Sequence, residues 1–150
     1  MNIKDELFRL IRALDVAGIP YALCGGLAMA VHGWPRSTMD IDMMVLPAHL
    51  DQVRHIARDR GFSHEPGSMS LSQGTITLVR LVKLSEQDVL PLDLILAGPG
   101  MEEVWTSRET LSTQDGPLTV ISRQGLIAMK RRRGSGVDLD DIDKLEAPDA

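Results

Sequence analysis

The stretch YALCGGLAMAVHGWPRSTMDIDMM, residues 21–44, constrains the fold of this chain more than any other part of the sequence. A short apolar run ends at Gly25 and Gly26, and a second apolar run begins with Asp40 and Asp42. This pattern predicts a strand, a tight turn, a short helix, a loop and a second strand. Aspartate is depleted in strands and costs free energy to bury without a partner. The two acids of the second strand therefore point to a bound divalent metal ion.

Length and composition predict one ordinary globular domain. A chain of 150 residues can form one hydrophobic core but not two full-sized domains, and 43% of its residues are hydrophobic. We therefore expect a single domain over residues 1–150, in which residues 137–150 form an acidic C-terminal helix and a frayed tail. The net charge of −5 argues against a protein that coats nucleic acid through bulk electrostatics.

Two features predict a cytoplasmic protein without membrane contact. The N-terminal segment MNIKDELFRL contains acids and no apolar run of signal-peptide length, and nowhere do about eighteen apolar residues follow one another. Cys24 is the lone cysteine and cannot form an internal disulfide, which fits a reducing compartment. Its place in an apolar strand predicts a small core residue rather than a nucleophile.

Hydrophobic spacing predicts the elements of the first half of the chain. Leu7, Leu10, Ile11 and Leu14 recur at the spacing of one helix face, which predicts a helix over residues 2–17. The remaining patterns predict strands at 21–24 and 39–46, helices at 27–32 and 47–61, and a polar loop at 64–74.

The second half of the chain begins with a predicted pair of strands. Residues 74–84 and 89–97 are rich in leucine and β-branched residues and are separated by the turn-like SEQD, which predicts two adjacent antiparallel strands. Pro91 indicates that the second strand begins there or lies near a sheet edge. Ser122 is a predicted helix cap. The elements expected after these strands are a short helix at 101–107, a strand at 118–121 and helices at 122–133 and 137–147.

Three aspartates from two of these strands form the candidate catalytic and metal site. The i, i+2 spacing places Asp40 and Asp42 on one face of their strand, and Asp93 is a third acid in an otherwise apolar strand. Magnesium takes oxygen ligands, and pairs of such ions about 3.5–4 Å apart hold the attacking and leaving oxygens of phosphoryl transfer. If its strand pairs beside theirs, Asp93 supplies a third ligand or accepts the proton of an incoming hydroxyl. Taken alone, Asp40 and Asp42 also fit a solvent-facing strand edge.

The glycine pair predicts a turn that approaches phosphates. Without side chains, Gly25 and Gly26 let the turn amides and the N-terminus of the following helix come close to a bound nucleotide. A glycine pair alone, or an Asp-x-Asp alone, is weak evidence of function. Both together with a later strand aspartate form a more specific pattern.

The glycine pair, RSTMDIDMMV and PLDLILA together resemble the nucleotidyltransferase fold of the DNA polymerase β superfamily. That resemblance implies an α+β fold with a mixed, mainly antiparallel sheet flanked by helices. More narrowly, GGLAMAVHGWPRSTMDID and LIAMKRRRGSGVDLDDIDKL are similar to small prokaryotic nucleotidyltransferase-like proteins related to the AbiEii toxins. Those proteins carry a lysine in a C-terminal helix and a nearby acidic stretch. The similarity covers most of residues 20–145.

The resemblance also implies roles for individual residues. Asp40 and Asp42 would be metal ligands, Asp93 would be a ligand that can also serve as base, and the cofactor would be Mg²⁺ or Mn²⁺. The implied nucleotide-binding residues are Gly25 and Gly26 at the triphosphate, Lys130 at the phosphates, and Arg36 and Thr38 in the same pocket. Two departures stand out. The second glycine replaces the serine of many catalytic members, and the large C-terminal domain that selects the acceptor in bigger relatives is missing.

Two functions follow from these observations. The first is a metal-dependent nucleotidyltransferase that moves a nucleoside monophosphate from an NTP to an acceptor hydroxyl and releases pyrophosphate. The second is a catalytically degenerate protein of the same fold that acts as a binding protein or as a toxin-antitoxin component with a partner protein. Relatives of this fold use tRNA ends, protein side chains and antibiotic hydroxyls as acceptors. The sequence does not choose among them, because its acidic balance disfavours RNA while the cluster KRRR favours it.

Overall fold

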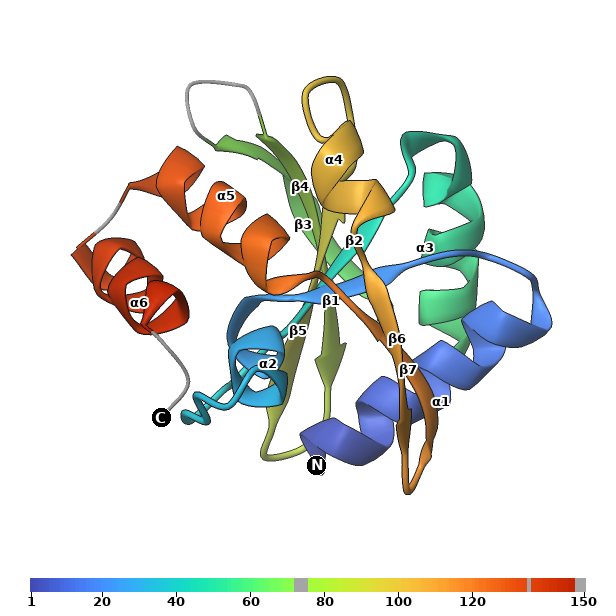
Figure 1. The fold of residues 1–150 in the computed structure, drawn as a ribbon. Helices are drawn as coiled ribbons and strands as arrows, with labels where there is room; N and C mark the ends of the chain where they lie inside the picture. Colours follow the sequence, from blue (N-terminus) through green and yellow to red (C-terminus); the bar gives the residue numbers. More distant parts are fainter. Residues whose placement is uncertain (72–75, 135, 148–150) are drawn as a thin grey trace.

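A computed structural model describes residues 1–71, 76–134 and 136–147 of the chain (Figure 1). The strands of these residues form one seven-stranded sheet in the order β3-β4-β5-β2-β1-β7-β6. Their bounds are β1 (Ala22–Cys24), β2 (Ile41–Val45), β3 (His64–Leu71), β4 (Ile76–Leu84), β5 (Val89–Leu96), β6 (Glu109–Thr113) and β7 (Gly116–Val120).

Helices flank the sheet on two sides in Figure 1, where two of them lie together at the right and three others gather at the left. The pair is α1 (Ile3–Val16) and α3 (Leu50–Asp59), and the group of three is α2 (Gly25–Val31), α5 (Arg123–Arg133) and α6 (Gly136–Glu146). The short elements are α4 (Glu102–Thr106) and a 3₁₀ turn, η1 (Pro47–His49). Among the helices of the described residues, none has both the length and the hydropathy that a membrane crossing requires.

The sheet is mixed and mainly antiparallel, as expected. Among the described strands, β1 pairs in parallel with β7 and β2 pairs in parallel with β5. The other four pairings are antiparallel. Because consecutive strands joined by short turns pair antiparallel while parallel pairs need a longer crossover, this mixture follows from the spacing of the strands along the chain.

The hydrophobic core lies between the sheet and its helices. The stripe of α1 that the sequence predicts is buried, with Leu10 and Leu14 fully so. The central strands contribute fully buried side chains such as Met43 and Leu94. Leu145 of α6 also reaches the core. Apolar burial of this kind is the main favourable contribution to folding.

The predicted strand pair at 74–84 and 89–97 is confirmed as β4 and β5 from residue 76 on, while residues 74 and 75 lie outside the described part of the chain. Leu84 lies opposite Val89 across their turn, and the strands run antiparallel from there. The suggested edge position of β5 is wrong, because this strand lies between β4 and β2. Pro91 is tolerated because the register with β2 begins only at Leu92, so its missing N–H falls before that ladder.

Two edge strands differ from the sequence prediction. Residues 64–71 of the predicted polar loop form β3, and residues 72–74 lie outside the described part of the chain. Pro66 and Gly67 suggested a loop, but they sit where the β3–β4 register shifts, which is where an edge strand accepts such residues. The strand β6 was not predicted at all. All of its residues are exposed, so it lacks the alternation of buried and exposed side chains by which a strand is recognised.

We predict that Ser122→Ala lowers the free energy of unfolding by about 1 kcal/mol, because α5 loses its N-cap. The Ser122 Oγ accepts a hydrogen bond from the backbone N–H of Gly125 at 2.9 Å and lies 2.7 Å from the Ser107 Oγ. Urea denaturation followed by circular dichroism measures the change. The control is Ser112→Ala in the exposed strand β6, and equal effects in both variants would contradict the capping role.

Candidate active site

The parallel pairing of β2 with β5 sets Asp42 directly beside Asp93. Asp40 precedes the first residue of β2 and lies in a bend. One carboxylate oxygen from each of the three residues lies within 4.8 Å of the corresponding oxygens of the other two. The structure thus brings together the three acids that the sequence singled out, while their roles as ligands and catalysts stay predictions.

This set of donors fits a hard divalent cation. Mg²⁺ and Mn²⁺ prefer carboxylate oxygens, and three of these converge here from one bend and two strands. Asp93 is buried, whereas Asp40 and Asp42 are half-buried, so water and substrate can supply the remaining ligands of an octahedral ion. Asp40, Asp42 and Asp93 are therefore the residues that would hold the metal.

The crowding of like charges changes the acidity of Asp40. Burial raises the pKa of the Asp40 carboxyl above its usual value, and the negative charge of Asp93 raises it further. The positive charge of Arg80 and a hydrogen bond with Asp42 oppose this rise. A cation bound among the three carboxylates would relieve their repulsion, which is the electrostatic reason for expecting a metal ion here.

Arg80 contacts the acidic cluster and was missed by the sequence reasoning. It lies on β4 as the register partner of Asp93 on β5. Its Nε and Nη2 donate to Oδ1 and Oδ2 of Asp93 at 2.7 and 2.8 Å. The hairpin register could have revealed this pair: with Leu84 opposite Val89, four steps along each strand lead to Arg80 and Asp93.

Gly25 and Gly26 make room for two side chains of the site. Gly25 has a φ of +66°, and a Cβ atom at this position would lie 1.9 Å from Oδ2 of Asp42. A Cβ atom on Gly26 would lie 2.8 Å from Oγ1 of Thr38. Both glycines are the first residues of α2, which follows β1 directly, whereas the sequence predicted a turn at these positions and a helix only from Leu27. Their observed role is to let the backbone approach Asp42 and Thr38, and their contact with a triphosphate stays a prediction.

Buried Cys24 precedes these glycines and is the register neighbour of Asp42. Burial raises the pKa of the Cys24 thiol, and the negative charge of Asp42 raises it further. The thiol therefore stays protonated at neutral pH and is a poor nucleophile. This agrees with its expected role as a small core residue.

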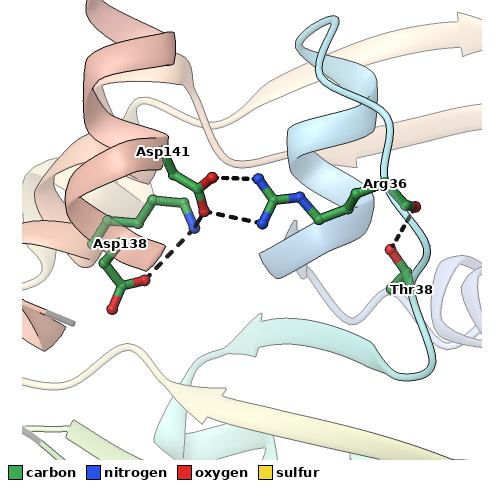
Figure 2. A network of polar contacts seen from close by, with 5 residues as sticks. Arg36, Thr38, Asp138 and Asp141 are labelled. Atoms are coloured by element: carbon green, nitrogen blue, oxygen red, sulfur yellow. Dashed lines mark hydrogen bonds and ion pairs between the residues drawn. The ribbon is translucent and has the colours of Figure 1, made fainter. Parts of the chain in front are cut away.

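Arg36 and Lys130, which were expected at the nucleotide phosphates, both contact Asp141 of α6. Figure 2 shows Arg36 reaching from the loop after α2 toward this carboxylate. Arg36 donates through Nη1 to Oδ2 of Asp141 at 3.1 Å and through Nη2 to Oδ1. Lys130 donates to Oδ2 at 2.9 Å, and its Nζ lies 3.9 Å from Asp138. Thr38 donates to the carbonyl of Arg36 at 3.3 Å.

Lys130 and the two aspartates of this network are buried, whereas the side chain of Arg36 is 30% exposed. Lys130 is 8% exposed, and Asp138 and Asp141 are less exposed still. Buried charges are tolerated when each has a partner, and here two cations meet two anions. Burial by itself raises the pKa of the Asp141 carboxyl, but hydrogen bonds from Arg36 and Lys130 outweigh it and the pKa lies below its usual value. In this arrangement the two cations fasten α6 to α5 and to the loop that leads into Asp40.

Comparison with known proteins gives structural matches. No family model matches the sequence, and no curated protein matches it. An antigenic nucleotidyltransferase-like protein from Paracoccidioides brasiliensis matches with a TM-score of 0.58 and 21% identity over 93% of this chain and 74% of its own. A Thermotoga maritima protein provisionally assigned as a nucleotidyltransferase matches with a TM-score of 0.60 and 12% identity over 96% of this chain and 94% of its own.

A third match is to ANT(2″)-Ia, an antibiotic-resistance factor whose structure was solved in complex with adenylyl-2″-tobramycin. Its TM-score is 0.58 at 12% identity, over 95% of this chain and 79% of its own. Together with the mixed, mainly antiparallel sheet, these likenesses show that the chain has the nucleotidyltransferase fold. At such low identity they show the fold alone.

We predict that Gly25→Ala displaces Asp42 from the acidic cluster, in addition to straining the backbone. The added Cβ must displace Asp42, whereas Gly18 has a nearly equal φ of +69° and nothing within 4 Å of an added Cβ. Each substitution costs about 1–2 kcal/mol of left-handed strain. Only Gly25→Ala is expected to lose Mn²⁺ binding, as measured by titration calorimetry. Comparable loss in Gly18→Ala would contradict a local effect on Asp42.

We also predict that Asp141→Asn lowers the free energy of unfolding by roughly 2–4 kcal/mol at pH 7, because the buried Lys130 and Arg36, whose side chain is 30% exposed, lose the anion they share. The pKa of Asp141 is lowered by folding, so its contribution is present above the unfolded pKa of about 3.9 and is lost as pH falls through the folded value. The difference in the free energy of unfolding between the native protein and the variant should therefore shrink below about pH 4. Denaturation at pH 7 and pH 3 measures it, with the exposed Asp143→Asn of the same helix as control.

Proposed function

We propose that this chain is a metal-dependent nucleotidyltransferase that transfers a nucleoside monophosphate from an NTP to an acceptor hydroxyl. The observation that carries the proposal is the convergence of Asp40, Asp42 and Asp93 on a nucleotidyltransferase fold. Three carboxylates from one bend and two paired strands are costly to assemble without a ligand, because like charges repel in a half-buried site. A metal-phosphate ligand is the occupant that best offsets this cost.

The three acids have distinct proposed roles. Asp40 and Asp42 hold Mg²⁺ or Mn²⁺ with help from Asp93, and a bound ion supplies charge neutralisation at the phosphates. The acceptor oxygen forms a bond to the α-phosphorus while the bond to the bridging oxygen of the β-phosphate breaks, and pyrophosphate leaves. Asp93, buried beside the other two acids, receives the proton of the acceptor hydroxyl. Catalysis then rests on positioning and charge neutralisation.

The nucleotide is proposed to lie over the start of α2. Gly25, Gly26 and Thr38 line its approach, and Arg36 and Lys130 are assigned to its phosphates. Both cations are paired with Asp141 in the present structure, so a phosphate group would have to share or replace that carboxylate. This competition predicts modest affinity for nucleotide without metal.

The acceptor is proposed to be a hydroxyl of a tRNA end, a protein side chain or a small molecule. The complex of ANT(2″)-Ia with adenylyl-2″-tobramycin favours the small molecule, because that protein shares the fold and holds an adenylylated product. We further propose that residues 1–150 work as a single domain in the cytoplasm, which fits the buried lone thiol of Cys24.

A second candidate function is a catalytically degenerate protein of this fold, related to the AbiEii toxins and acting on a partner protein in a toxin-antitoxin pair. The pairing of Arg36 and Lys130 with Asp141 favours it, because these two cations are engaged within the chain. The two functions differ in turnover, so a transfer assay separates them.

We predict that the native protein transfers label from an α-³²P-labelled NTP to an acceptor in a cell lysate in the presence of Mg²⁺. Asp93→Asn should reduce the rate at least about a hundredfold, because it removes the proposed proton acceptor. Calorimetry of Asp40→Ala combined with Asp42→Ala should show no Mg²⁺-dependent NTP binding. The exposed Asp143→Asn serves as control and should leave both measurements unchanged.

The outcomes of this assay are distinct. Nucleotide binding without transfer, in a protein that melts cooperatively, favours the degenerate alternative. Absence of both binding and transfer for all four NTPs would remove the enzymatic proposal. Transfer that persists in Asp93→Asn would refute the role given to that residue.

A further inference from the structure

Arg80 extends the row of charged residues that crosses the centre of the sheet. Asp42 on β2 is the register neighbour of Asp93 on β5, and Asp93 is the register neighbour of Arg80 on β4. Three adjacent strands therefore place two acids and one guanidinium side by side. Arg80 is the cation of this row that contacts the acidic cluster directly, through Asp93.

The contact engages both oxygens of Asp93. Nε and Nη2 of Arg80 donate to the two carboxylate oxygens at 2.7 and 2.8 Å, which is the bidentate arrangement of a guanidinium on a carboxylate. The side chain of Asp93 is 4% exposed, whereas that of Arg80 is 37% exposed. A chelated metal ion and a bidentate guanidinium compete for the same edge of a carboxylate. Arg80 holds that edge of Asp93.

Charge balance also argues against a second divalent ion beside Arg80. Three ionised carboxylates, one guanidinium and one divalent ion have no net charge together. A second divalent ion would leave this partly buried cluster two charges positive before any phosphate arrived, and uncompensated charge is costly away from water. Each cation added near Arg80 is also repelled by its fixed positive charge.

We propose that Arg80 takes the place of one divalent cation, so that the protein without nucleotide binds a single Mg²⁺ or Mn²⁺, held mainly by Asp40 and Asp42. Asp93, occupied by Arg80 along one edge, is then left to act on the acceptor hydroxyl instead of chelating a second ion. The inference rests on the proposed function insofar as the cluster is a metal site. Arg80 is a positioning and charge-balancing residue in this account.

The test is a Mn²⁺ titration at pH 7.5 in about 0.1 M KCl without nucleotide, with free Mn²⁺ measured by electron paramagnetic resonance. The native protein should bind one ion. Arg80→Gln keeps an amide donor for Asp93 but removes the charge, and it should bind the first ion about tenfold more tightly or take up a second ion. Arg80→Lys keeps the charge and should resemble the native protein.

A matched control comes from the same strand. Lys83 is also paired with a poorly exposed acid, Glu6, at 2.8 Å. It follows Arg80 by three positions, an odd offset that places it on the opposite face of β4. Lys83→Gln therefore removes the same charge away from the cluster, where salt screens it. Its Mn²⁺ affinity should stay within about twofold of the native value.

The outcomes separate this inference from the proposed function. Two ions of similar affinity in the native protein, or no ion at all, would overturn the inference whatever the variants do. So would an Arg80→Gln variant that melts cooperatively yet binds the first Mn²⁺ no more tightly and takes up no second ion, or an equal gain in Lys83→Gln. Nucleotide transfer is measured separately, so a transferase with two bound ions would refute only the role given to Arg80. A protein with one ion and no transfer would refute only the proposed function.

Discussion

Parallel pairing of β2 with β5 is the constraint on which the candidate site depends. It joins segments separated by about 50 residues, and closing such a loop costs conformational entropy. Apolar burial beside the acids offsets this cost, because four flanking side chains on the two strands are fully buried: Ile41, Met43, Leu92 and Leu94. The same pairing that buries these residues forces Asp42 against Asp93. The apolar contacts of the sheet thereby stabilise an arrangement of carboxylates that electrostatics alone would oppose.

Charge compensation takes two different forms in this molecule. In the acidic cluster, as far as the described residues show, three carboxylates gather beside the Arg80 guanidinium, and a bound cation can neutralise further negative charge there. In the network on α6, the ion pairs among the described residues join two cations, Arg36 and Lys130, to two anions, Asp138 and Asp141. A balanced buried network stabilises a single packing arrangement, whereas an unbalanced cluster favours the binding of a counter-charge. This contrast is the electrostatic reason for placing the chemistry at the strands rather than at α6.

Much of the fold and the three acids could be predicted from the sequence, because local patterns determine them. Alternation of acid and apolar residues indicated the face of Asp42, and the Gly-Gly turn placed α2. The two strands that escaped prediction, His64–Leu71 and Glu109–Thr113, are the two edges of the sheet. An edge strand pairs on one side only and need not be buried on both faces, so its sequence carries little apolar signal.

Contacts between distant segments had no such local signal. The pair formed by Arg36 and Asp141 joins a loop to the C-terminal helix, and nothing in either segment specifies the other. The pair of Arg80 with Asp93 could have been predicted, because counting residues from the turn between β4 and β5 sets these two side by side. Register is therefore a source of information about polar side chains in hairpins that a search for motifs leaves unused.

The close approach of Gly25 to Asp42 links two positions that motif descriptions treat as separate. A side chain at position 25 and a carboxylate at position 42 cannot occupy the same space, since the added Cβ would lie 1.9 Å from Oδ2. In chains that share this geometry, the two positions are therefore not free to vary independently. Loss of the carboxylate alone would not remove the steric requirement for glycine, because the added Cβ would still lie 2.8 Å from the Cβ of residue 42. Substitutions at positions 25 and 42 are thus linked by steric overlap, apart from any effect on the chemistry of the site.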